Sequence, residues 1–104
     1  MQRKFTEKQS LQLNNLLSNY QIQSRWIGRQ YIREIIEVLY FDSSLIKSLN
    51  HHVYPVIANK YNTSIQSIEK SVRNAINKSN FKSIDITNKT FIANIIEQMK
   101  GLCK

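Results

Sequence analysis

A run of polar and charged side chains between residues 66 and 77 is spaced so that one face of a helix would carry them. They combine cationic donors, a carboxylate acceptor and amides, which are the groups that hydrogen-bond to DNA base edges and phosphates. The residues are Gln66, Ser67, Glu69, Lys70, Arg73, Asn74 and Asn77. The chemistry they offer is contact with nucleic acid, provided that the rest of the chain folds to expose this face.

The residues around this segment have the spacing of a helix-turn-helix. Its first helix needs a small residue where the second helix crosses it, and Ala58 supplies one. Its turn needs a residue that tolerates a left-handed backbone, as Asn62 does. The second helix, predicted near residues 65–79, must bury one stripe against the first, and it reads double-stranded DNA in the major groove. That stripe consists of Ile65, Ile68, Val72, Ala75 and Ile76.

The remaining sequence has helical periodicity and almost no strand pattern. This predicts an all-α fold, a compact bundle of about five to six helices. Thr6 and Gln9 resemble a capping box at the start of a helix that ends near Tyr20. Gly28 is expected to permit a bend into a helix over about residues 29–41, which has the strongest periodic signal in the chain.

Two further helices are expected on either side of the motif. Asp42 and Ser43 are predicted to cap a short helix that ends at Asn50. Pro55, the only proline, is expected in the first turn of the first motif helix, where its missing N–H costs nothing. A last helix over about residues 90–100 is predicted to end at Gly101. Its apolar stripe consists of Phe91, Ile92, Ile95, Ile96 and Met99.

Composition and charge limit the classes of function. The 104 residues, 41% of them hydrophobic, suffice for one core, so residues 1–104 are expected to form a single domain. Lys and Arg number 15 against 7 acidic residues, and the net charge of +8 favours an anionic partner. No apolar run approaches the roughly 20 residues that cross a bilayer, and the cations do not line one amphipathic face. A cytoplasmic protein without a membrane partner is therefore expected.

Three segments resemble the C-terminal effector domain of stage zero sporulation protein A. They are Tyr31–Ile36, Val53–Thr63 and Ile68–Ile76. The similarity is convincing over about residues 22–76, and it is much more specific than a bare helix-turn-helix pattern. The resemblance implies a compact helical bundle that binds a short G·C-containing box on DNA as tandem or paired copies. It also implies that the second motif helix lies in the major groove.

The resemblance assigns Glu69, Lys70 and Arg73 to recognition-helix positions that face DNA. Glu69 can accept from a cytosine amino group and Lys70 can donate to guanine, each contact contributing about 1–3 kcal/mol of discrimination. The family has arginine at the position of Lys70, so a point charge replaces a planar fork and sequence preference is expected to be relaxed or altered. Predicted base contacts are Gln66, Glu69, Lys70, Arg73 and Asn74, and predicted phosphate contacts are Arg25, Arg29, Lys60, Thr63 and Ser67.

Two departures from the family concern regulation. No phosphoacceptor receiver domain is expected before this region, and the control of binding is then expected to lie elsewhere. The segment Ser83–Thr87 stands where the family has a further helix and a long loop that contact RNA polymerase. The expected role is a small transcription regulator or a site-marking accessory factor, with repression or competition for boxes more natural than activation. Homodimers and tandem copies on DNA both fit this role.

Other functions have less support. His51 and His52 are adjacent, so on a helix they point about 100° apart and do not readily ligate one metal, although they can touch DNA phosphates. No nucleophile motif or glycine-rich phosphate loop is found, so no enzyme, cofactor or small-molecule substrate is expected. The rival hypothesis is a protein-interaction module that antagonises a related regulator without reading DNA, pairing through the apolar stripe of the last helix.

Overall fold

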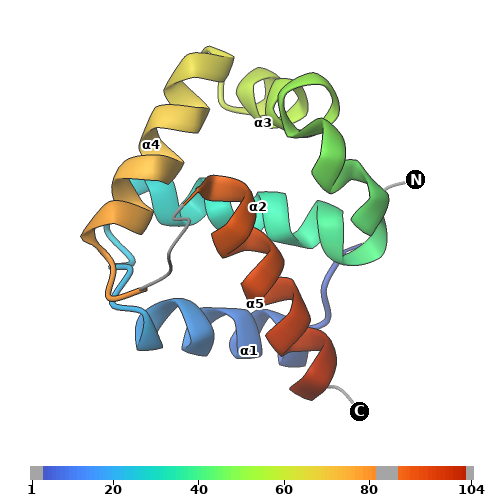
Figure 1. Ribbon diagram of the computed structural model, residues 1–104, viewed down its shortest axis with the longest axis vertical. Coiled ribbons are helices and arrows are strands. Elements are labelled where there is room, and N and C mark those ends of the chain that lie inside the picture. Colours follow the sequence, from blue (N-terminus) through green and yellow to red (C-terminus); the bar gives the residue numbers. More distant parts are fainter. Residues whose placement is uncertain (1–3, 82–86, 103–104) are drawn as a thin grey trace.

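The computed structural model describes residues 4–81 and 87–102, which form helices and connecting turns (Figure 1). The helices are α1 (Glu7–Asn19), α2 (Ile27–Phe41), η1 (Ser43–Ser48), η2 (Leu49–Val53), α3 (Tyr54–Lys60), α4 (Ile65–Lys78) and α5 (Asn88–Leu102). No strand occurs in these residues. The prediction of an all-α bundle is confirmed.

Helix α2 crosses the middle of the molecule, and the other helices surround it (Figure 1). α3, α4, α5 and η1 all contact α2, while α1 packs against α5 on the opposite side from α3. The stripe of α2 that faces these neighbours is completely buried at Ile32, Ile35, Ile36 and Leu39. The strong period of this segment is therefore that of a central core helix.

The start of α1 follows its predicted capping signal. The Thr6 hydroxyl accepts a hydrogen bond from the Gln9 backbone N–H at 3.2 Å, and the Gln9 side chain accepts one from the Thr6 N–H at 2.9 Å. These two bonds satisfy N–H groups that the first turn leaves without helical partners. α1 then ends at Asn19, with Tyr20 as its C-cap, as predicted.

Gly28 has a different purpose from the predicted one. It lies inside the first turn of α2 and has no positive φ, so it does not form a bend. A Cβ atom at this position would lie 2.4 Å from the Ser71 carbonyl oxygen and 2.9 Å from Ala75 Cβ. Gly28 is thus needed because α2 and α4 approach too closely for a side chain, which fixes the recognition helix against the core.

A Gly28→Ala substitution is expected to lower the free energy of unfolding by up to about 2 kcal/mol. Overpacking costs about 1–3 kcal/mol, and the better helix propensity of alanine returns about 1 kcal/mol. Urea unfolding followed by circular dichroism measures the change. Gly101→Ala is the matched control, because a Cβ there meets nothing within 4 Å. If both variants gain stability equally, α2 and α4 are not in contact at Gly28.

The short helix after α2 differs from its prediction. Asp42 precedes η1, but its side chain accepts from the Ser44 hydroxyl at 2.7 Å and makes no capping bond to the backbone. Asn50 does not end the helix, because η2 continues through it as a π-helical turn and runs directly into α3. Leu49 and Val53 are buried on either side of the exposed Asn50, so core contacts override its tendency to break helices.

The α3–α4 pair has the predicted features of a helix-turn-helix. Pro55 lies in the first turn of α3, and Ala58 is buried where the two helices meet. Asn62 has a φ of 53° and so supplies the left-handed residue of the turn. The Thr63 N–H donates to the Ala58 carbonyl at 2.9 Å, which closes the end of α3.

The apolar stripe of α5 lies in the core of its own chain. Phe91, Ile92, Ile95, Ile96 and Met99 are all at most 7% exposed. The rival hypothesis of pairing between chains through this stripe therefore loses one of the features that motivated it. Gly101 does not end α5, which continues to Leu102. The predicted difference at Ser83–Thr87 lies outside the described residues, except for Thr87.

Candidate nucleic-acid interface

The position of α4 is fixed at its start and along one face. The Ser64 hydroxyl accepts a hydrogen bond from the Ser67 N–H at 3.1 Å, which caps the helix. The predicted stripe is buried at Ile68, Val72, Ala75 and Ile76, each at most 3% exposed. Ile65 is an exception, since it is 37% exposed: it lies in the first turn, beyond the point where α4 meets the core.

The predicted base-reading residues lie together on the outer side of this helix. Four of them are exposed and Glu69 is half-buried. Because the core stripe is completely covered, α4 has one orientation and presents the same set of polar groups to solvent. The exposed residues are Gln66, Lys70, Arg73 and Asn74.

Glu69 and Arg73 form an ion pair one helical turn apart. A carboxylate oxygen of Glu69 lies 3.0 Å from a guanidinium nitrogen of Arg73, and the two side chains are 39% and 55% exposed. Such an exposed pair contributes only a few tenths of a kcal/mol to stability. Its effect is to orient both groups beside the exposed Lys70.

The start of α5 is tied to the motif behind this ion pair. The Asn88 side-chain amide donates to the Glu69 carbonyl oxygen at 3.2 Å and to the Tyr54 hydroxyl at 3.4 Å. Tyr54 is 2% exposed, and burial raises the pKa of its hydroxyl, so the group stays neutral. These contacts connect the first helix of the motif, the recognition helix and α5.

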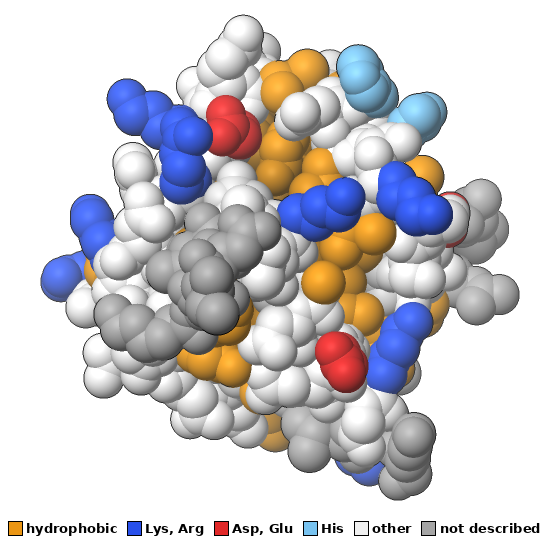
Figure 2. Space-filling model, in the orientation of Figure 1, with side chains coloured by type: hydrophobic (Ala, Val, Ile, Leu, Met, Phe, Trp, Pro, Cys, Tyr) orange, Lys and Arg blue, Asp and Glu red, His pale blue; other side chains and the backbone are white. Residues whose placement is uncertain are grey.

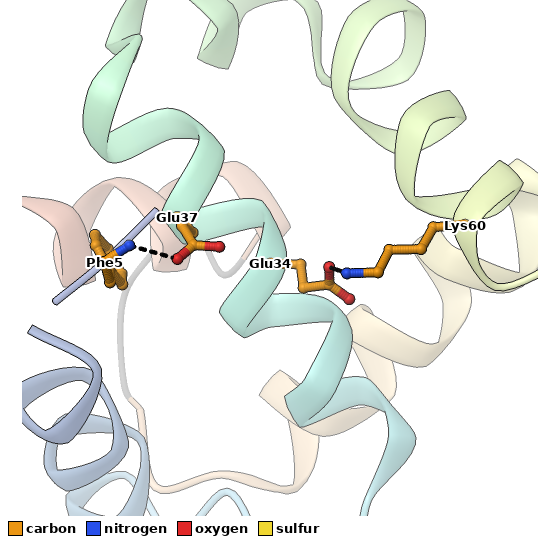
Figure 3. A network of polar contacts seen from close by, with 4 residues as sticks. All are labelled: Phe5, Glu34, Glu37 and Lys60. Atoms are coloured by element: carbon orange, nitrogen blue, oxygen red, sulfur yellow. Dashed lines mark hydrogen bonds and ion pairs between the residues drawn. The ribbon is translucent and has the colours of Figure 1, made fainter. Parts of the chain in front are cut away.

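Three of the predicted phosphate contacts lie near the N-terminal end of α4. Ser67 is exposed in its first turn, and Thr63 is half-buried in the turn before it. Lys60, at the end of α3, has a side chain that is 62% exposed and forms an ion pair with Glu34 of α2 (Figure 3). The hydrogen bond that Lys60 donates to Glu34 raises the pKa of Lys60 and keeps it charged. In the same network, the Phe5 N–H donates to Glu37 at 2.7 Å.

Arg25 is exposed in the loop before α2. The residues that follow it, Trp26 and Ile27, line a small hollow together with Asn74 and Lys78 of α4. The Lys78 ammonium lies 5.4 Å from the centre of the Trp26 ring. Arg25 is thus next in sequence to the wall of a second basic region, near the C-terminal half of α4.

The structure corrects the expectation that Arg29 contacts phosphate. Arg29 is 8% exposed, and its guanidinium donates to the Ile22 carbonyl, to the Asn14 carbonyl at 3.1 Å and to the Ser18 hydroxyl at 3.2 Å. Burial, with a smaller effect from Arg33, lowers its pKa below the usual value of arginine. Arg29 connects α1 and the following loop to α2, and its guanidinium is directed to these acceptors instead of to solvent.

One basic region was not predicted from the sequence. A groove of about 770 Å³ separates η1 and η2 from α4 and the start of α5. Figure 2 shows it face-on, with hydrophobic side chains in its floor and Lys, Arg and His side chains around it. Lys47, His51 and Lys89 line it together with Glu69 and Arg73. These basic side chains come from η1, η2, α4 and α5, so no local motif could have indicated the groove.

No group of three or more His, Cys, Asp or Glu side chains in the part of the chain that the structure describes could hold a metal ion. None of its helices has the length and hydropathy of a membrane span.

A first helix with one buried face, a left-handed turn and a second helix with an exposed polar face define a helix-turn-helix domain. Residues 13–101 match the family described as "Sporulation initiation factor Spo0A C terminal". The chain belongs to this family, whose members are DNA-binding effector domains of sporulation regulators. DNA binding is accordingly its general function.

Proposed function

We propose that this protein binds double-stranded DNA sequence-specifically and acts as a small transcription regulator or a site-marking accessory factor. The proposal rests on the two faces of α4. One face is buried in the core, and the outer face carries carboxylate, ammonium, guanidinium and amide groups, which hydrogen-bond to base edges. In the major groove, this outer side faces the bases.

The functional group of each base-reading residue determines the base or phosphate that it contacts. Glu69 accepts from a cytosine amino group, and Lys70 donates to the O6 and N7 atoms of guanine. Arg73 is one turn further along and reaches a second guanine or a phosphate, with Glu69 orienting its guanidinium. The amides of Gln66 and Asn74 donate to and accept from adenine, and they extend the contact along the exposed side.

Phosphate contacts fix the register of α4 on the duplex. Lys60, Thr63 and Ser67 contact one strand near the N-terminal end of the helix, where the helix dipole also favours an anion. Arg25 contacts the backbone near its other end. Because Lys60 is paired with Glu34, its contribution is smaller than that of an unpaired lysine.

Fluorescence anisotropy of duplexes at about 50 and 200 mM salt tests the proposal, since phosphate contacts weaken steeply over this range. One duplex carries the family's G·C-containing box and the other a scrambled sequence. We expect tighter binding to the box at both salt concentrations. Equal affinity with an equal salt slope would leave only phosphate attraction, and an unbiased selection of DNA sites would then decide whether another box is read.

The number of bound copies is part of the same proposal. Members that read paired boxes bind as dimers or tandem monomers, and we propose one of these arrangements here. Titration of duplexes with one and with two boxes measures the stoichiometry. Binding of two copies to the double box supports it, and cooperativity between them indicates a dimer, whereas binding of a single copy to the double box contradicts it.

A further inference from the structure

Basic side chains outnumber acidic ones in the lining of the groove between η1, η2, α4 and α5. Lys47, His51, Arg73 and Lys89 line it, and Glu69 is the only acid among its described lining residues. Glu69 is already paired with Arg73. The lysines on the two rims, Lys47 and Lys89, are exposed, so an anion in the groove can reach them.

Lys89 occupies a position that helix stability disfavours. It lies in the first turn of α5, where the helix dipole makes a cation unfavourable and an acid favourable. No acidic residue is found in that turn. A lysine at this place has a physical reason if the groove receives a negatively charged partner.

The groove is continuous with the recognition helix. Glu69 and Arg73 belong both to its wall and to the base-reading side of α4. A helix that enters the major groove, which is about 12 Å wide, has a sugar-phosphate strand on each side of it. The side of α4 that carries Asn74 and Lys78 faces Trp26 and Ile27, and the side that carries Glu69 and Arg73 faces the cationic groove.

We propose that this groove binds the phosphates of the DNA strand that flanks the box, with Lys47, His51 and Lys89 as the contacting residues. This inference rests on the proposed function, and it extends the DNA-binding surface from α4 to η1, η2 and α5. The strand runs past Arg73, which stands between the bases and this second set of cations. DNA outside the box then contributes affinity without contributing sequence preference.

The test compares Lys47→Gln/Lys89→Gln with Lys4→Gln/Lys8→Gln. Both double variants remove two positive charges from exposed positions, but Lys4 and Lys8 lie at the N-terminal end of the chain, away from the groove. At 200 mM salt we expect the groove variant to bind box and scrambled duplexes about tenfold more weakly, with a salt slope shallower by about 1.8. The control variant is expected to change the affinity much less.

A duplex trimmed to the box adds a second comparison. Trimming the flank is expected to weaken DNA binding by the unmodified protein about tenfold. The affinity of the groove variant is expected to stay nearly unchanged, because this variant already lacks the contacts that the flank provides. If the groove variant and the control variant have the same salt slope and lose the same affinity on trimming, the groove does not contact DNA. If inorganic pyrophosphate binds the groove while DNA affinity is independent of Lys47 and Lys89, the groove is a site for a small anion and the proposal is overturned.

These outcomes are separate from those of the proposed function. Failure of the proposed function means that the unmodified protein does not distinguish the box from the scrambled duplex. Failure of the present inference leaves that discrimination intact while the groove and control variants behave alike.

Discussion

Replacing both Lys70 and Arg73 with alanine is expected to remove most of the preference for the box over a scrambled duplex. Each well-placed side chain at a base edge contributes about 1–3 kcal/mol of discrimination, so the pair contributes a ratio of about 100-fold. Both side chains are exposed, and the core stripe of α4 does not include them, so the fold is expected to remain intact. The ratio of the two dissociation constants, measured by anisotropy at one salt concentration, gives the result.

Two further variants show whether the loss concerns bases or charge. Lys4→Ala/Lys8→Ala removes the same charge far from α4 and is expected to retain the ratio. Lys70→Arg restores a planar bidentate donor and is expected to sharpen the preference for guanine. An alternative result is that the alanine substitutions at Lys70 and Arg73 lower the affinity for both duplexes equally and leave the ratio of dissociation constants unchanged. In that case the two residues contact only phosphates, and α4 does not read sequence through them.

The parts of the fold that could be predicted are those specified by local patterns. The period of Ile32, Ile35, Ile36 and Leu39 indicates a helix with one buried face, and α2 has that face fully covered. The turn at Asn62 could also be predicted, because few residue types tolerate a positive φ. In both cases the determining interaction lies within a few residues along the chain.

Helix ends are harder to predict, because contacts between residues far apart in the sequence determine where a helix stops. Asn50 and Gly101 are residues that often end helices, yet η2 and α5 both continue through them. For η2 the buried Leu49 and Val53 stabilise the next turn more than the local residue weakens it. The close helix contact at Gly28 could not be predicted, because its closest neighbours, Ser71 and Ala75, lie more than 40 residues away in the sequence. A glycine considered with its sequence neighbours alone indicates a bend.

The candidate site divides in the same way. The outer side of α4 follows from its period, because a stripe that is buried determines which residues remain exposed. The groove could not be predicted, since Lys47, His51 and Lys89 meet only when η1, η2 and α5 pack around α4. Arg29 could not be assigned either, because the charge of an arginine does not indicate whether it contacts solvent or a buried carbonyl.

Arg29→Met is expected to lower the free energy of unfolding by about 3 kcal/mol or more. The substitution keeps most of the side-chain volume and removes the donors to the Ile22 and Asn14 carbonyls and to Ser18. Hydrogen bonds from a charged group contribute about 1.5–3 kcal/mol each, and an acceptor left buried adds its desolvation cost. Urea unfolding measures the loss, and DNA affinity is measured under conditions where the variant is still folded.

Arg25→Met separates this structural function from contact with DNA. Arg25 is exposed, so its replacement is expected to change the free energy of unfolding by less than about 0.5 kcal/mol while weakening binding to box and scrambled duplexes alike. Folded Arg29→Met protein is expected to bind DNA as the unmodified protein does. Should Arg29→Met instead keep its stability and lose DNA affinity, Arg29 contacts phosphate after all, and its buried hydrogen bonds do not hold α1 to α2.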